Sequence, residues 1–219
     1  MKLKLTLLAL CLCLFNCKEA KETPKKVEFN YKYPSVQKLI DCENIDTSLL
    51  QEALYSFESD LENFYTPDKP ILSRAYSIFT AQAVSNKVDY KKMVSPHSKK
   101  VLEALKQDKD LWINNPDGSP VNFNHPLFKC VAEKIGDEPL QKTFSALIET
   151  NSMSMRMIGN ELRPKTFRMK DDKYLAIFMA LELYYGRLYN LDLSADTSTA
   201  TDETSGTTED DAHAGHNHQ

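Results

Sequence analysis

The stretch DDKYLAIFMALELYYGRLYN, residues 171–190, carries apolar side chains on nearly every side between a charged start and a polar end. Its apolar residues include Tyr174, Leu175, Ile177, Phe178, Met179, Leu181 and Leu183. A helix that is apolar all round is normally buried in the middle of its domain. The stretch therefore predicts a central helix that begins near Asp171-Asp172, because carboxylates favour the positive end of the helix dipole.

Three tyrosines in the second half of this stretch allow two interpretations. Tyr184, Tyr185 and Tyr189 could line a groove for a sugar or a peptide. Aromatic residues at helical spacing more often belong to the core, where they bury a large apolar area. We therefore expect these rings to be packed inside the domain.

The segments before the central stretch repeat apolar residues every three or four positions, which is the spacing of one helix face. Starts of helices are expected at Asp46, Thr66-Pro67, Ser95-Pro96, Pro126 and Asp137. A small polar side chain caps the first turn of a helix, and proline is well tolerated at its first position. These signals predict a set of amphipathic helices that cover the central one.

Residues 152–168 are harder to assign. Met153, Met155 and Met157 alternate as in a strand, but methionines also fill irregular gaps in a core. No pair of segments with a good hairpin turn is found elsewhere, and Asn114–Pro120 is typical of a loop. The sequence therefore predicts an all-α fold, a single domain of about six helices over residues 36–193.

The first seventeen residues have the parts of an export signal. Lys2 and Lys4 precede an apolar run that is too short to cross a membrane as a helix, and Leu14-Phe15-Asn16-Cys17 follows at its end. This ending resembles a bacterial lipobox, although Asn16 stands where a small residue is usual. The resemblance implies a signal peptide over residues 1–16, acyl chains such as palmitate on Cys17, and a lipidated tether over residues 17–35. The alternative is an ordinary secretory signal that is cut nearby.

Lipidation implies a location in the bacterial cell envelope, anchored to a membrane without spanning it. The outer membrane, at its periplasmic or surface face, is the expected site. An exported chain also favours a disulfide between Cys42 and Cys130, the two cysteines that remain after the signal and the lipidated residue. The alternative is a pair of buried free thiols, since cysteine packs as a small apolar residue.

Charge is unevenly distributed along the chain. With the two lysines of the signal and the six carboxylates after residue 194 set aside, 25 basic and 25 acidic residues remain. A neutral body argues against nucleic acid as a partner, because phosphate binding requires a basic surface. Residues 194–219 contain no large apolar side chain, so we expect a disordered acidic tail.

The tail contains the clearest candidate for metal chemistry. His213, His216 and His218 lie within six residues, and Asp210 and Asp211 come just before them. Imidazole is a good ligand for Zn, Cu and Ni, and carboxylates add negative charge. The tail is therefore a candidate metal site. The alternative is a purely solubilising tail that carries sugars on its Ser and Thr residues.

Motifs of several enzyme classes are missing from the sequence. It has no haem-attachment motif, no glycine-rich phosphate loop and no Gly-x-Ser-x-Gly nucleophile elbow. His97 and His125 both stand beside prolines at expected helix starts, which favours a structural role. The sequence thus favours a non-enzymatic envelope lipoprotein that works by binding or assembly with an envelope protein partner. The alternative function is metal handling through the tail, and an enzyme is the third possibility.

Overall fold

The computed structural model describes residues 29–34, 39–115 and 118–194. Within these ranges the fold is all-α, as the sequence predicts, and the only β-type pairing is an isolated bridge between Trp112 and Val121. Eight helices are present there if the last three segments, which follow one another without a break, count as one. In chain order the helices are α2 (Thr47–Tyr65), α3 (Leu72–Val84), α4 (Tyr90–Met93), α5 (Pro96–Leu105), α6 (Pro126–Lys134), α7 (Glu138–Glu149), α8 (Met155–Leu162), α9 (Lys173–Met179), the π-helical η4 (Ala180–Tyr185) and α10 (Gly186–Tyr189). Two short 3-10 helices complete the set, η2 (Lys109–Leu111) and η3 (Arg163–Arg168).

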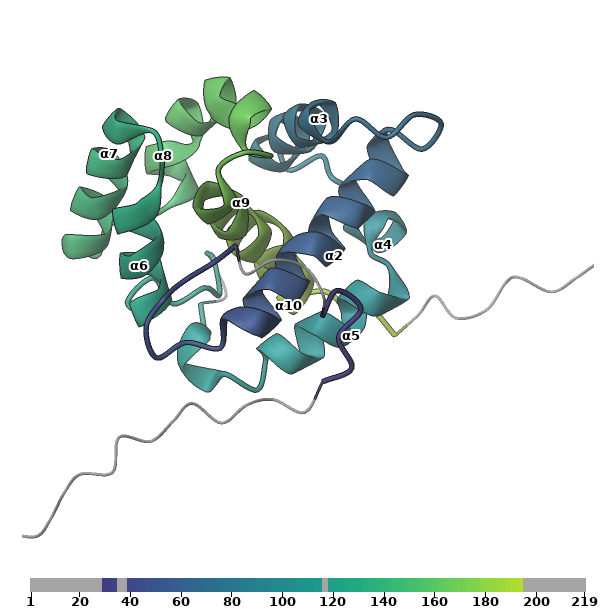
Figure 1. Ribbon diagram of the computed structural model, residues 1–219, viewed down its shortest axis with the longest axis horizontal. Coiled ribbons are helices and arrows are strands. Elements are labelled where there is room, and N and C mark those ends of the chain that lie inside the picture. The colour runs from purple at the N-terminus through teal and green to yellow at the C-terminus, as the bar shows by residue number, and fades with distance from the viewer. Residues whose placement is uncertain (1–28, 35–38, 116–117, 195–219) are drawn as a thin grey trace, which may run out of the picture.

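The continuous helix α9–η4–α10 is the centre of the domain. Every residue from Leu175 to Gly186 is buried, and the side chain of Asp172 caps the start by accepting a hydrogen bond from the Leu175 amide at 3.0 Å. Figure 1 shows α2 crossing this helix, with α6, α7 and α8 on one side and α3 and α4 on the other. The predicted central helix is therefore confirmed, and Tyr184 and Tyr185 lie in the core.

Helix α2 packs against α3, α5 and the central helix. The side chain of Asp46 caps α2 by accepting a hydrogen bond from the Ser48 amide. Phe57 is fully buried, and its ring lies 5.1 Å from that of Phe79 and 5.1 Å from that of Tyr184. These aromatic contacts connect the consecutive helices α2 and α3 to the central helix, which follows much later in the chain.

One expected helix start is wrong. Thr66 does not begin α3 but ends α2, and its hydroxyl accepts a hydrogen bond from the Ile71 amide at 3.3 Å. The reason is the second proline of the segment, Pro70, because a residue that precedes proline disfavours helical backbone. Helix α3 therefore begins only at Leu72.

The other expected caps are present. Ser95, His125 and Asp137 each accept a hydrogen bond from an amide in the first turn of α5, α6 and α7 respectively. The region 152–168 forms α8 and η3, so its interpretation as a strand is wrong. Met155 and Met157 lie on α8, whereas Met153 lies just before it and is buried.

A disulfide joins Cys42 to Cys130, with the two Cα atoms 5.9 Å apart. It connects the segment before α2 to α6, across 88 positions of sequence. The ammonium of Lys134 also donates a hydrogen bond to the Asp41 carbonyl beside it. These two contacts hold the segment before α2 against α6, which comes much later in the chain.

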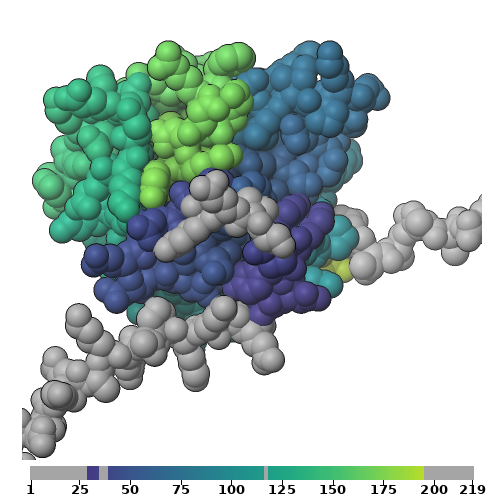
Figure 2. All heavy atoms as spheres, viewed as in Figure 1, coloured from purple at the N-terminus to yellow at the C-terminus, as the bar shows by residue number. Residues whose placement is uncertain are grey.

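Residues 29–34, which the sequence placed in the tether, instead lie against the domain. Figure 2 shows them in purple, packed on its surface. The amides of Lys32 and Tyr33 donate hydrogen bonds to the buried carboxylate of Glu52, at 2.7 and 3.0 Å. The domain therefore begins before residue 36. Among the described helices, none is long and apolar enough to cross a membrane.

Candidate functional site

Most of the residues predicted to carry function lie outside the described ranges. These are Cys17 and the tail residues His213, His216, His218, Asp210 and Asp211. Lipidation and metal binding by the tail therefore stay predictions. Within residues 29–34, 39–115 and 118–194, no group of three or more His, Cys, Asp or Glu side chains is arranged to hold a metal ion.

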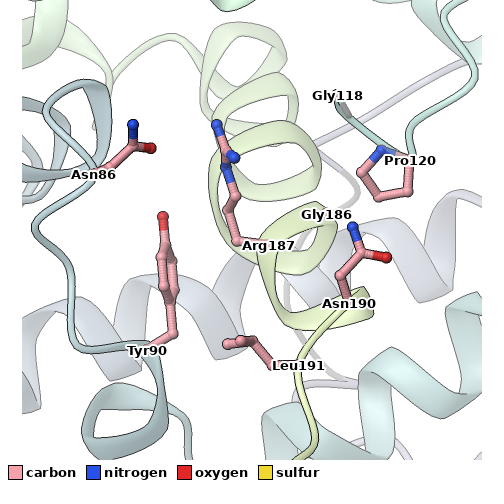
Figure 3. A pocket seen from close by; sticks show the side chains of 8 residues that line it. All are labelled: Asn86, Tyr90, Gly118, Pro120, Gly186, Arg187, Asn190 and Leu191. Atoms are coloured by element: carbon pink, nitrogen blue, oxygen red, sulfur yellow. The ribbon is translucent and has the colours of Figure 1, made fainter. Parts of the chain in front are cut away.

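A cavity of about 250 Å³ lies between the end of α3, the start of α4, the loop at Gly118–Pro120 and α10. Figure 3 shows its lining, with the side chains of Tyr90 and Arg187 extending alongside each other from opposite walls. The complete lining is Asn86, Tyr90, Gly118, Pro120, Gly186, Arg187, Asn190 and Leu191. One cation, two amides and a phenol thus line the cavity together with the apolar side chains of Pro120 and Leu191.

The wall on the side of α3 is fixed by a turn and a hydrogen bond. Asn86 has a φ of 53°, in the left-handed region that asparagine tolerates better than most residues, and so ends α3. Tyr90 follows at the start of α4, and its hydroxyl donates a hydrogen bond to the carbonyl of Leu183 at 2.8 Å. Burial raises the pKa of Tyr90, so the phenol stays protonated and continues to donate. This bond fastens the wall to the central helix.

The opposite wall depends on the π-helical turn η4. Such turns interrupt the regular hydrogen-bond ladder and occur frequently at functional sites. Directly after η4, the missing side chain of Gly186 lets the loop approach the helix closely. A Cβ atom there would lie 3.0 Å from the Leu181 carbonyl oxygen and 3.2 Å from Cγ2 of Val121. The close approach brings Gly118 and Pro120 to the edge of the cavity.

Arg187 is the charged residue of this cavity and is half-buried. Its guanidinium makes no hydrogen bond or ion pair with any residue in the described part of the chain. Its positive charge acts on Glu182 and Tyr90, whose pKa values it lowers against the larger effect of burial. A guanidinium has five N–H donors, so this group retains its capacity to bind an acceptor.

Glu182 lies behind the cavity, in η4, and is only 3% exposed. Burial raises the pKa of its carboxyl to about 7, while the hydrogen bond from the Ser119 hydroxyl and the charge of Arg187 act in the opposite direction. Ser119 also accepts a hydrogen bond from the Val121 amide at 3.1 Å, which shapes the loop. The loop beside the cavity is therefore held by a carboxyl group that changes its charge near neutral pH.

Two further cavities exist among the described residues. One, of about 520 Å³, is lined by Trp112 and Tyr189, whose rings stack on each other 4.7 Å apart. The other, of about 300 Å³, lies between α2 and the start of α5.

Sequence reasoning did not find Glu182 or Arg187. A signal was present, since Glu182 is a charged residue within the otherwise apolar run from Tyr174 to Tyr185. A buried charge is costly unless it has a partner or a use. His97 and His125 were placed at helix starts, as observed, but the contact of His97 with Glu52 at 2.6 Å was not foreseen.

Comparison with protein-family models, with curated proteins and with solved structures finds no match for this chain.

Proposed function

We propose that the protein is a lipid-anchored envelope protein of binding type, whose helical domain binds a small anionic ligand at Arg187. The ligand carries a carboxylate or phosphate group, to whose oxygens the guanidinium donates hydrogen bonds. The observation that carries the proposal is the half-buried guanidinium without a partner in the described chain, at the wall of a cavity.

Arginine suits this role because its planar fork matches the oxygens of a carboxylate or a phosphate. A partly buried cation without a counter-charge is unfavourable, and an anionic ligand would supply that charge. Because Glu182 is protonated below a pH of about 7, it adds little repulsion toward an anion in that range.

The rest of the lining adds specificity. The amides of Asn86 and Asn190 can donate to further oxygens of the ligand, and Pro120 and Leu191 provide apolar contacts. A few placed polar groups over an apolar surface are typical of small-molecule sites. The volume of about 250 Å³ limits the ligand to a small organic acid or phosphate ester.

The location is supported by two features. Leu14-Phe15-Asn16-Cys17 resembles a lipobox, and the Cys42–Cys130 disulfide is typical of chains that leave the reducing cytoplasm. Globomycin treatment and mass spectrometry of the N-terminal peptide test the anchor directly. An unmodified Cys17 in the mature protein would contradict lipidation.

The binding proposal is tested by titrating the full chain with phosphate, succinate and citrate, using calorimetry. Arg187→Met keeps most of the side-chain stem and removes the charge. It should weaken the Kd about tenfold to a hundredfold, which corresponds to the loss of charge-assisted hydrogen bonds. Arg156→Met, at an exposed arginine of α8, is the matched control and should bind like the wild type. Equal affinity in both variants, or no binding of any of the three anions, would refute the proposal.

The His-rich tail supports a second candidate function, the handling of Zn, Cu or Ni. Three imidazoles within six residues can converge on one ion, with copper bound most strongly. Deleting residues 209–219 should abolish binding of these ions in competition with free histidine, and leave anion binding at Arg187 unchanged. Metal binding that survives the deletion would contradict this second candidate.

A further inference from the structure

A separate cavity, of about 300 Å³, lies where α2 faces the start of α5 and residues 32–33. Its lining is Lys32, Tyr33, Ser56, Ser59, Asp60, Asn63, Ser95, Pro96 and His97. None of these residues lines the Arg187 cavity. The two cavities are therefore separate features of the domain.

The cavity is lined by a polar stripe on α2. Ser56 and Asp60 are four positions apart, and so are Ser59 and Asn63, so the four residues share one face of the helix. This face lies opposite α5, where a helix in a core would normally place apolar side chains. The stripe makes one whole wall of the cavity hydrophilic.

Asp60 is the innermost charge of this wall and is only 2% exposed. It accepts hydrogen bonds from the Tyr184 hydroxyl and from the Ser95 amide, and both end on the same oxygen, Oδ2. Its other oxygen, Oδ1, accepts no hydrogen bond from the described residues. A carboxylate oxygen can accept two hydrogen bonds, so this atom can accept one from a ligand.

Ser56 is a second buried group without a bond. Its side chain is 2% exposed, and its hydroxyl has no hydrogen-bond partner in the described chain, although it lies near the Tyr185 phenol. Closer to the surface, the Asn63 amide donates to the Ser59 hydroxyl at 3.4 Å. Polar groups with spare capacity thus line the cavity from its interior to its mouth.

The opposite wall is held by Glu52. This carboxylate is 1% exposed and has three partners, the amides of Lys32 and Tyr33 and the Nε2 atom of His97. These bonds hold residues 32–33 over the side of α2 and α5. Because both carboxylate oxygens of Glu52 already have hydrogen-bond partners, Glu52 holds the wall of the cavity in place. The ligand contacts then come from the polar residues of α2.

We infer that this cavity binds a neutral, hydroxyl-rich ligand of monosaccharide size. A sugar hydroxyl both donates and accepts, so it can donate to Oδ1 of Asp60 and accept from the Asn63 amide or the Ser59 hydroxyl. An anion would be repelled by Asp60, and a cation would meet the ammonium of Lys32 at the same cavity. Neither charge fits as well as a neutral polyol.

Tyr33 adds the apolar contact that such a ligand requires. Its ring lines the cavity and lies 5.5 Å from that of Tyr55, which fixes its position. The C–H face of a sugar ring can pack on an aromatic ring of this kind, while the polar edge bonds to the stripe. The cavity thus offers an apolar surface and hydrogen-bonding groups together.

The inference is tested by two-dimensional NMR of the full chain, with glucose, galactose and N-acetylglucosamine added to about 20 mM, a range that detects a millimolar Kd. At least one sugar should give saturable shifts at residues of α2 and the start of α5. Ser59→Ala and Asn63→Ala together should weaken that binding about tenfold, because each removes hydrogen bonds to the ligand. Both positions are only half-buried or exposed, so the fold should be retained.

Two controls separate this site from the others. Asn160→Ala, at an exposed asparagine of α8, should leave sugar binding unchanged, and so should Arg187→Met. The absence of saturable shifts with all three sugars would overturn the inference. So would sugar binding that Ser59→Ala and Asn63→Ala leave intact, or shifts at α2 caused by tetramethylammonium or acetate instead of sugars.

Discussion

Replacing Glu182 by Gln should make the protein more stable at pH 8. It should also remove the part of the pH dependence of the unfolding free energy that comes from the Glu182 carboxyl. The carboxyl is 3% exposed, and burial raises its pKa from 4.5 to about 7. In the unfolded chain the same group titrates near its ordinary value. The folded and unfolded states therefore hold different numbers of protons between these two values.

The direction and size of the effect follow from proton linkage. Below a pH of about 4.5 both states are protonated, and Glu182 has no effect on the pH dependence. Between there and about pH 7 the folded state keeps a proton that the unfolded state has released, so stability falls by about 1.4 kcal/mol per pH unit. The gap of about 2.5 units gives a total loss of about 3 kcal/mol, complete above pH 7.

The assay is urea unfolding of the full chain at half-unit steps from pH 4.5 to 8, for the wild type and for Glu182→Gln. Gln has nearly the same shape and can still accept the hydrogen bond from the Ser119 hydroxyl. The difference in unfolding free energy between the two proteins should shift by about 3 kcal/mol in favour of the variant across this range. Other titrating groups are common to both proteins and cancel.

A difference that stays constant with pH would refute the reasoning. It would mean that Glu182 titrates alike in the folded and unfolded states, through water or a cation close to its carboxyl. A difference that changes in the opposite direction would mean that Arg187 dominates over burial and keeps the carboxyl ionised.

Two further predictions concern the disulfide and the close packing around Gly186 at the Arg187 cavity. Replacing both Cys42 and Cys130 by Ala should lower the free energy of unfolding by about 4–5 kcal/mol, because the disulfide closes a loop of 88 positions in the unfolded chain. Urea unfolding measures this loss. A reductant that destabilises the variant as much as the wild type would contradict the prediction. Gly186→Ala should cost about 1–3 kcal/mol, because its Cβ would lie 3.0 Å from the Leu181 carbonyl oxygen. Gly159→Ala is the matched control, since its nearest contact is an ordinary 3.7 Å, and an equal effect of the two substitutions on the urea midpoint would exclude the steric explanation.

The polar groups inside the domain show where sequence reasoning stops. Asp46, Ser95 and Asp137 were recognisable as caps because each acts on an amide within three residues of it. Asp60 gives no such signal, since its partner Tyr184 is 124 positions away. A stripe of polar residues on α2 could have been noticed, but not that it faces α5 and residues 32–33.

The sequence by itself determined the all-α fold, the buried central helix at residues 171–190 and the two cysteines available for a disulfide. Periodicity and capping depend on neighbours within about four residues, so they can be read along the chain. At Thr66 a capping side chain predicted a helix start, whereas Pro70 disfavoured helical backbone before it, and the predicted start was wrong. The tertiary structure alone decided that Arg187 and Tyr90 share a cavity and that Ser119 bonds to Glu182, 63 positions away. Such contacts depend on how whole helices pack, and a π-helical turn redirects the side chains that follow it. The candidate sites therefore emerge only after the helices are assembled.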